Sequence, residues 1–499
     1  MSAATALAPF RTRSFRFLWP ADVLTAWAME METLILGWYV LVETGSVVLL
    51  TLFGSLMYVG TLVSPVVGML GDRLGLGRVL ATLRVTYACM AGVILVFAFI
   101  GKLHPTVVLC VAALAGVVRP SDIGMRSALI SATLPAQHLV AALGISRTTQ
   151  DSARICGALV GAGFMAAFGM TPAYLVITSM YLLAAWMTFR AAVDTPDSSA
   201  TPAPAAASPQ RPSPWSEVRE GLVHVWRTPL LRAAMSLAAL VNLTAFPLTM
   251  GLMPYTAKEV FHLDQRGLGW LVASFACGAL IGSLALSAWG RRLPQARVML
   301  GASFMWYLCL AGFVWSATVP MAMVMLLLAG MAQSLSMVSL SIILLRTTEE
   351  RFRGRIMGVR MLAIYTLPLG LMAAGALIPV VGYQPTGLVY VVIGLLLTLA
   401  IGAAWRTELL PRGALAKRGL RPSTSLGTGP STSSGRTARL RVLGKWQDLV
   451  YRANGEPYCS GRSGRDLRRA GLGIAGGSEP ALSQRKAMNC RLTKTWRCS

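Results

Sequence analysis

The sequence predicts an all-α polytopic membrane protein with twelve transmembrane helices in two six-helix halves. Of its 499 residues, 55% are hydrophobic and only 13% are charged, and the mean hydropathy is +0.60. Apolar runs long enough to cross a hydrocarbon layer of roughly 30 Å recur along most of the chain. Only helices can satisfy the backbone across so many continuous spans without water, so we expect a helical bundle.

Twelve apolar runs can be placed between Trp19 and Trp405, separated by short polar breaks. The first six cover residues 19–42, 47–70, 79–101, 106–129, 147–169 and 172–190. The second six cover residues 231–253, 268–289, 297–317, 319–345, 357–381 and 386–405. The first run is too long for a cleaved signal peptide and lacks a cleavage pattern, so we expect it to be a retained span.

A linker and a tail divide the chain into an N-terminal half (1–190), a cytoplasmic linker (191–214), a C-terminal half (215–405) and a basic tail (406–499). The linker is rich in Pro, Ala and Ser and predicts a flexible segment. The tail holds 19 Lys and Arg against five Asp and Glu, without a sustained helical or strand period. We expect it to be disordered. A frameshift or read-through and a genuine basic tail both remain open as its origin.

The segment after the linker predicts an amphipathic helix on the inner membrane surface. Its apolar residues recur on one helical face: Trp215, Val218, Leu222, Val225 and Trp226. An ordinary soluble helix packed on the bundle is the alternative.

Basic residues gather in the loops of one side, which predicts that both termini are cytoplasmic. The opposite loops hold only Lys102, Lys258 and Arg266. This bias and the tail together account for most of the formal net charge of +25, so the charge does not indicate nucleic-acid binding, although it suits anionic lipid.

Cysteine and histidine usage predicts no metal site, no cofactor and no enzyme activity. None of the eight cysteines belongs to a CxxC motif, and the four histidines lie near span ends or in loops. An intramembrane enzyme is therefore the rejected alternative.

Glu30 and Glu32 lie in the middle of the first apolar run, in the stretch AMEMETL. An ionisable side chain at the centre of a bilayer costs about 2.5 to 3.5 kcal/mol by insertion scales, so both need a physical reason. A buried carboxyl group can avoid that cost by binding a proton, because burial favours its neutral form. Since a group that binds and releases protons suits a proton-driven transporter, we expect both to serve in proton coupling.

The two glutamates point about 200° apart on a helix, so they cannot face one cavity equally. We expect Glu32 to line the cavity, on a stripe with Tyr39. Glu30 shares a face with Gly37 and is expected to lie in a helix contact. The alternative is that hydroxyls or arginines pair with both carboxylates, which then have no role in transport.

The loop GMLGDRLGLGR, residues 68–78, resembles the signature of the major facilitator superfamily between its second and third helices. The matching residues are Gly68, Asp72, Arg73, Gly75 and Arg78. Glycines allow helices and a tight loop to approach closely, and the carboxylate can accept hydrogen bonds from a helix N-terminus or an arginine.

Four further stretches resemble the exporter branch that includes the enterobactin exporter and macrolide efflux proteins: FRTRSFRFLW (10–19), GWYVLVETGS (37–46), ARICGALVGAGF (153–164) and FRGRIMGV (352–359). The resemblance implies two halves that rock about a central site. It further implies a monomeric, proton-coupled antiporter of the bacterial inner membrane, which exports a small organic molecule such as a drug, a siderophore or a similar metabolite. A membrane scaffold or receptor derived from a transporter is the alternative.

Charged residues at spacings of three and four residues lie at the inner ends of spans four and five. Arg119, Asp122 and Arg126 share one face, and Arg147, Asp151 and Arg154 share another. In the family resembled, similar charges join the signature loop to the bundle as a cytoplasmic gate. We expect that gate to contain the signature residues with Asp122, Arg126, Asp151 and Arg154; a solvated interfacial charge ladder is the alternative.

A substrate cavity is expected between the halves. Asn242 and Gln333 are among the few polar residues at depth in the second half, and Phe246 and Met250 could offer soft apolar contacts. With Tyr39 they form the expected lining. Ordinary packing is the alternative for the apolar pair.

Overall fold

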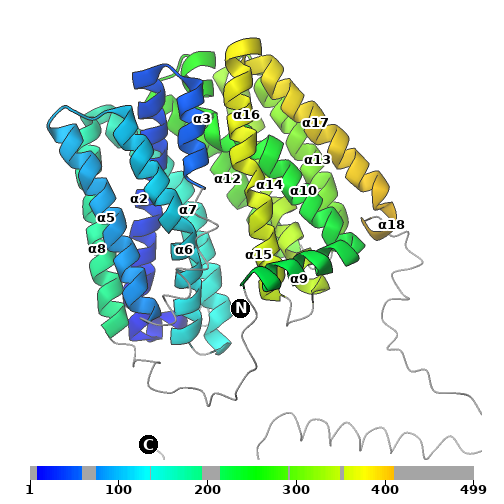
Figure 1. The fold of residues 1–499 in the computed structure, drawn as a ribbon, viewed down its shortest axis with the longest axis horizontal. Helices are drawn as coiled ribbons and strands as arrows, with labels where there is room; N and C mark the ends of the chain where they lie inside the picture. The colour runs from blue at the N-terminus through cyan, green and yellow to red at the C-terminus, as the bar shows by residue number, and fades with distance from the viewer. Residues whose placement is uncertain are drawn as a thin grey trace, which may run out of the picture. The chain divides into compact units, whose positions relative to one another are not determined.

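The computed structural model describes residues 8–58, 75–134, 136–193, 214–289, 293–348 and 353–409. Every regular element in these ranges is helical, and the helices form two groups (Figure 1), as the sequence predicts. The N-terminal half consists of the short η1 (Ala8–Arg11), α2 (Arg13–Thr44), α3 (Val47–Leu56), α5 (Leu76–Phe99), α6 (Pro105–Thr133), α7 (Ala136–Phe168) and α8 (Met170–Val193).

The C-terminal half begins with α9 (Pro214–Arg227), which lies across the lower end of α15 in Figure 1. The spans of this half are α10 (Pro229–Phe246) with η4 (Pro247–Gly251), α11 (Met253–Tyr255) and η5 (Thr256–Val260), then α12 (Gln265–Trp289), α13 (Gln295–Val314), α14 (Val319–Thr347), α15 (Arg353–Ile364) with α16 (Thr366–Val381), and α17 (Tyr383–Ala404). A short α18 (Arg406–Leu409) comes last.

All twelve expected spans coincide with helices, although residues 59–70 of the second lie outside the described ranges. Three boundaries differ from expectation. Helix α7 already begins at Ala136, span seven continues to Val260 through two π-helical turns, and span eleven is divided at Tyr365. Within the described residues, nine helices are long and apolar enough to cross a membrane. Helices α2 and α7, which carry several charged residues, are not among the nine.

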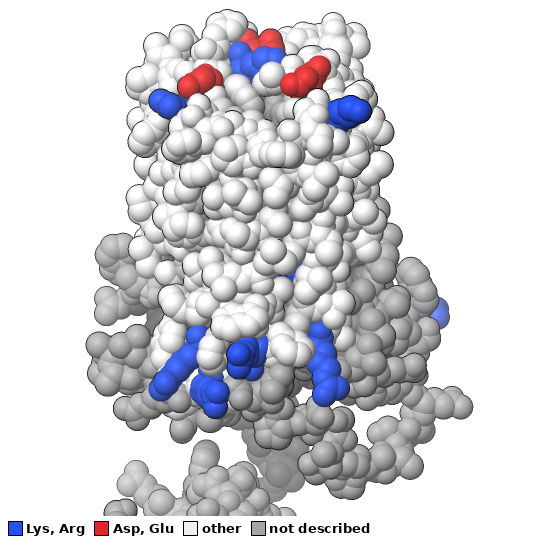
Figure 2. Space-filling view, turned by 90° about the vertical axis from the view of Figure 1, so that its left-hand side faces the viewer, with Lys and Arg blue, Asp and Glu red and all other residues white. Residues whose placement is uncertain are grey.

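The two ends of the bundle differ in charge. We call the end that holds the N-terminus of α2 the basic end and the other the opposite end. Figure 2 shows the face of the N-terminal half, where charged side chains lie near the two ends of a wide uncharged band. Turns at the opposite end are tight: Gly45 ends α2 with φ +62°, and its N–H donates to Leu41 O over 2.9 Å. Ser46 then caps α3 by accepting from Leu49 N.

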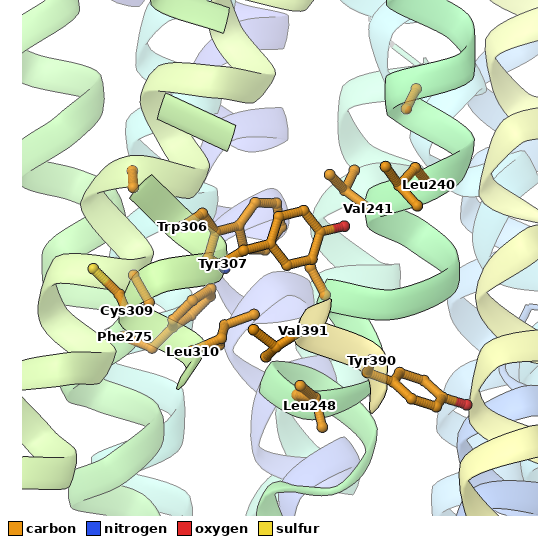
Figure 3. Close-up of a cluster of buried hydrophobic side chains, with 14 of the residues drawn as sticks. Leu240, Val241, Leu248, Phe275, Trp306, Tyr307, Cys309, Leu310, Tyr390 and Val391 are labelled. Atoms are coloured by element: carbon orange, nitrogen blue, oxygen red, sulfur yellow. The ribbon is translucent and has the colours of Figure 1, made fainter. Parts of the chain in front are cut away.

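A continuous apolar core fills the C-terminal half (Figure 3). Trp306 and Tyr307 on α13 are fully buried in it. The Trp306 ring packs edge-on against Phe246 with centroids 5.1 Å apart, and the Tyr307 hydroxyl shares a 2.7 Å hydrogen bond with Thr244. Aromatic pairs of this geometry add to the stability that burial provides.

The halves contact one another mainly toward the opposite end. Helix α3 packs on α16, where Ser55 Oγ donates to Pro368 O over 3.3 Å and a β-carbon on Gly375 would overlap Thr51. Helix α7 packs on α12, with Gly269 close against Ala162. Small residues at these positions let the backbones approach. The described structure is therefore closed between the halves at the opposite end.

The structure describes two segments near the expected domain boundaries. On α9, Val225 is buried in the core of the C-terminal half, whereas Leu222 and Trp226 are exposed. The side chains of residues 214–218 lie outside the described part. The C-terminal half also extends past Trp405, because Leu409 on α18 is fully buried and α18 packs on α13 and α17. The rest of the expected tail, from residue 410, lies outside the described residues.

Candidate functional site

Glu32 lies inside the N-terminal half, between α2, α6 and α8. Its side chain is 5% exposed, and Oε2 accepts a 3.0 Å hydrogen bond from the Tyr181 hydroxyl. Arg119 Nη2 on α6 lies 3.5 Å from the same oxygen, while Arg119 Nη1 donates to Thr33 over 3.0 Å. The carboxylate is thus buried but paired, as a buried charge must be to remain ionised.

Glu30 has a more open environment one helical face away. Its Oε1 lies 3.7 Å from Arg154 Nε on α7, and the two side chains are 39% and 36% exposed. Gly157, one turn further along α7, lets the two helices approach, since a β-carbon there would press on Glu30. An ion pair with this exposure can be reached by a proton or a ligand.

Glu30 lies in the contact of α2 with α7, at Gly157, and is nevertheless more exposed than Glu32. Both placements follow from the rotation of α2. Gly37, seven residues after Glu30 and so on the same face, packs against Pro254 of α11, 3.5 Å from where its β-carbon would lie. Glu32 faces α6 and α8 of its own half, and Glu30 faces α7 on the side of α2 where, two turns further on, Gly37 meets the C-terminal half.

A second buried ion pair lies nearer the basic end. Arg84 on α5 donates from Nη2 to Asp22 Oδ1 on α2 and from Nη1 to Thr188 Oγ1 on α8, and its Nε lies 3.8 Å from Asp122 Oδ1 on α6. Arg84 is completely buried and Asp22 is 3% exposed. Arg126 on α6 is also buried. One guanidinium thereby joins four helices.

This charged layer separates two apolar clusters of the N-terminal half. Phe15, Leu80 and Leu129 belong to the cluster on its basic side, whereas Ile35 and Ile94 belong to the cluster on its other side. Because paired charges are costly to separate in an apolar interior, the layer fixes the register of the four helices.

The structure brings only part of the expected cytoplasmic gate together. Gly68, Asp72 and Arg73 lie outside the described residues. Gly75 precedes α5 with φ +91°, and Arg78 is exposed on α5. Asp151 is buried on α7. Asp122 faces Arg84 and Arg154 faces Glu30, so these two charges of α6 and α7 are paired within the N-terminal half.

The expected cavity lining is dispersed. The Tyr39 hydroxyl donates to Leu103 O over 2.8 Å at the opposite end of the N-terminal half. Asn242 is buried and donates to Ala238 O of its own helix. Phe246 is partly buried and packs edge-on against Trp306. Gln333 is buried on α14, and Met250 is 36% exposed on η4.

Sequence reasoning missed the Asp22, Arg84 and Thr188 connection and the role of Tyr181. Arg84 and Asp22 were visible as opposite charges inside apolar runs, and two such residues in different spans are a signal for a buried pair. The Tyr181 hydroxyl offered no such signal, because tyrosines are common in spans.

No other feature of the described residues competes with this site. Among them, no group of three or more His, Cys, Asp or Glu side chains could hold a metal ion. An apolar groove of about 380 Å³ between α5 and α6, with Cys89 and Cys110 on its walls, contains none of the expected site residues.

The chain belongs to the major facilitator superfamily, whose family model matches residues 18–250 and 235–453. It is thus a member of a family of multi-pass secondary transporters. No curated protein sequence matches that of the chain.

Solved transporter structures share the fold at low sequence identity. A bacterial homologue of the iron transporter ferroportin in an inward-facing state matches with a TM-score of 0.59 and 15% identity, covering 80% of this chain and 99% of that one. The nucleoside transporter NupG matches with a TM-score of 0.58 and 15% identity, over 78% and 98% of the two chains. A D-xylose–proton symporter matches with a TM-score of 0.57 and 13% identity, over 77% and 95%. At these identities the likeness concerns the fold alone.

Proposed function

We propose that the protein exports a small amphipathic organic molecule across the bacterial inner membrane in exchange for protons. The half-exposed ion pair of Glu30 and Arg154 is the observation that carries this proposal. It lies on the face of α2 that turns toward the C-terminal half, where the two halves of a transporter of this family move against each other.

The chemistry of exchange follows from competition at one carboxylate. Ionised Glu30 is stabilised by Arg154 and can also accept a hydrogen bond or a cationic group from a bound molecule. Protonation removes that charge, so a proton and a substrate compete for Glu30. Because each displaces the other, downhill proton entry can drive substrate exit.

Glu32 serves as the buried partner of this exchange site. Its pairing with Arg119 and Tyr181 holds Arg119 against Thr33, between the two glutamate faces of α2. Glu32 thereby stays paired in the interior and keeps Arg119 in place beside α2.

The described conformation is closed at one end, as one stage of the transport cycle requires. Contacts of α3 with α16 and of α7 with α12 close the opposite end, which the positive-inside rule assigns to the outside of the cell. Both termini are then cytoplasmic. Opening these contacts while the signature loop around Asp72 closes the basic end would complete alternating access.

The proposal is tested by proton release from the purified protein. Candidate substrates come from an untargeted comparison of compounds retained by cells with and without the protein. In weakly buffered detergent solution, adding such a compound should release protons from the parental protein. A compound that binds without proton release would exclude antiport through this site, and the lack of any differing compound would favour the scaffold or receptor alternative.

A further inference from the structure

The interior of the N-terminal half contains two buried sets of ion pairs, one above the other. One is the pair of Glu32 with Arg119, and the other is the layer around Arg84. On α8, Tyr181 donates to Glu32 and Thr188 accepts from Arg84. These two α8 residues are seven positions apart, which is about 10 Å along a helix. A stretch of about two turns therefore separates the two sets.

Tyr87 on α5 lies between the two sets. It follows Arg84 by three residues, so it lies one turn further toward the opposite end on the same helical face. Its ring packs on that of Tyr181, with centroids 5.4 Å apart. The charges of Asp122 and of Arg119, one from each set, both act on its phenol. Tyr87 is thus close to both sets from a single position.

Several polar atoms in this region are buried without a hydrogen-bond partner among the described residues. They are the hydroxyl oxygens of Tyr87, Tyr174 and Thr178, and Oδ1 of Asp122. Tyr174 and Thr178 precede Tyr181 by seven and three residues, so all three lie on one face of α8. Tyr87 and Tyr174 are 2% and 0% exposed, which excludes bulk solvent as their partner.

Ordered water is the ligand that fits these atoms. The large majority of buried polar groups in proteins have a hydrogen-bond partner, either protein or ordered water. A buried water molecule makes about three hydrogen bonds and so serves several such groups at once. Each hydroxyl can donate to water and accept from it, and the carboxylate oxygen can accept.

We propose that ordered water molecules bind between the two sets of ion pairs and, together with the Tyr87 hydroxyl, join them into one hydrogen-bonded network. A change at Glu32 then reaches the layer around Arg84, which joins four helices, because hydrogen bonds in a chain strengthen or weaken one another. This inference concerns the N-terminal half alone and does not rest on proton coupling.

Radiolytic footprinting of the full-length protein in detergent detects bound water without any variant. An X-ray pulse converts water into hydroxyl radicals, which modify the nearest side chains, and mass spectrometry measures the rate. Tyr307 is the matched control, since it is also fully buried but its hydroxyl is bonded to Thr244. We expect Tyr87 and Tyr174 to be modified several times faster than Tyr307. Equally slow modification of all three tyrosines would overturn the proposal.

Isotope exchange distinguishes ordered water from an open channel. The protein is mixed with water that carries a heavy oxygen isotope and is irradiated after increasing delays. The heavy isotope should appear in modified Tyr87 later than in modified His104, which is exposed at the opposite end. Equally early appearance at both residues would show bulk water and contradict an ordered site.

Tyr87→Phe tests the connection, because it removes the hydroxyl and keeps the ring against Tyr181. Its shift in melting temperature is measured in the parent, in Glu32→Gln and in Asp122→Asn. We expect the shift to fall by roughly half in both variant backgrounds, since each already weakens the network. Tyr307→Phe, the same change in the other half, should give equal shifts in all three backgrounds. Equal shifts for Tyr87→Phe as well would contradict a network that joins the two sets.

Discussion

Glu30 on α2 and Arg154 on α7 form an ion pair, 3.7 Å from Oε1 to Nε, in which both side chains stay more than a third exposed. Two residues further along α2, Glu32 is held in the interior by Arg119 and Tyr181. The same helix thus carries one carboxylate that can exchange partners and one that cannot do so without leaving the partly buried Arg119 unpaired. Substitutions of the two glutamates should therefore have different effects on transport and on stability.

Glu30→Gln should abolish substrate-induced proton release and flatten the pH dependence of transport, because glutamine imitates the protonated acid permanently. Its melting temperature should stay close to that of the parent, since an exposed ion pair contributes at most about 1 kcal/mol. Glu32→Gln is the matched variant on the same helix. It leaves Arg119 without a charged partner in the interior and should lower the melting temperature clearly. Both properties are measured on the same detergent-purified samples.

The opposite outcome would reassign the proton site. Proton release that persists in Glu30→Gln and disappears in Glu32→Gln, at unchanged stability of the latter, would transfer coupling to the buried carboxylate. Substrate-induced proton release that persists in the double variant would show that neither glutamate is the proton-coupling site.

Asp22→Asn should destabilise the N-terminal half by about 3 to 5 kcal/mol, because it leaves the fully buried Arg84 without its closest countercharge. The measurement is thermal or denaturant unfolding in detergent. Lys258→Gln breaks the surface pair with Glu259, 3.5 Å apart, and should change stability by less than about 1 kcal/mol. Equal stability of the two variants would show that the charged layer does not hold the four helices together.

Gly375→Ala should loosen the closure at the opposite end, because the added methyl group would overlap Thr51 across the junction of the halves. Gly92→Ala on α5 is the control, since the position of its β-carbon is open space. Spin labels replacing Glu43 and Glu259, which lie at the opposite end of different halves, report the change by pulsed dipolar spectroscopy. We expect a longer distance to gain population in Gly375→Ala only; an unchanged distribution would mean that this contact does not limit opening.

Truncation should distinguish the short helix α18 from the residues after it. A chain that ends at residue 411 keeps Leu409, which is fully buried, and should fold and transport like the full chain. A chain that ends at residue 407 lacks this side chain. Its free energy of unfolding should be lower by about 2 to 5 kcal/mol, the usual cost of deleting a buried leucine. Size-exclusion profiles and melting curves in detergent compare the two. Indistinguishable chains would show that α18 adds nothing to the bundle.

Length and hydropathy were sufficient to predict the twelve spans, because the thickness of a bilayer sets the length of its helices. Helical periodicity also placed Glu30 and Glu32 on different faces, but it could not say which face meets which neighbour. That depends on the rotation of α2, which contacts such as Gly37 with Pro254 determine. Periodicity likewise grouped Leu222 with Val225 and missed that the bundle covers only part of that face.

The central claim is that proton movement and substrate movement are coupled through Glu30. Everted membrane vesicles that contain the protein, loaded with a pH-sensitive dye and energised to an acidic interior, test it most directly. Addition of a substrate identified by the cell comparison should partly collapse the pH gradient in vesicles with the parental protein or with the Lys258→Gln control. Vesicles with Glu30→Gln should show no collapse at equal protein levels. An equal collapse with Glu30→Gln, or none with the parental protein while it accumulates the substrate, would contradict the account.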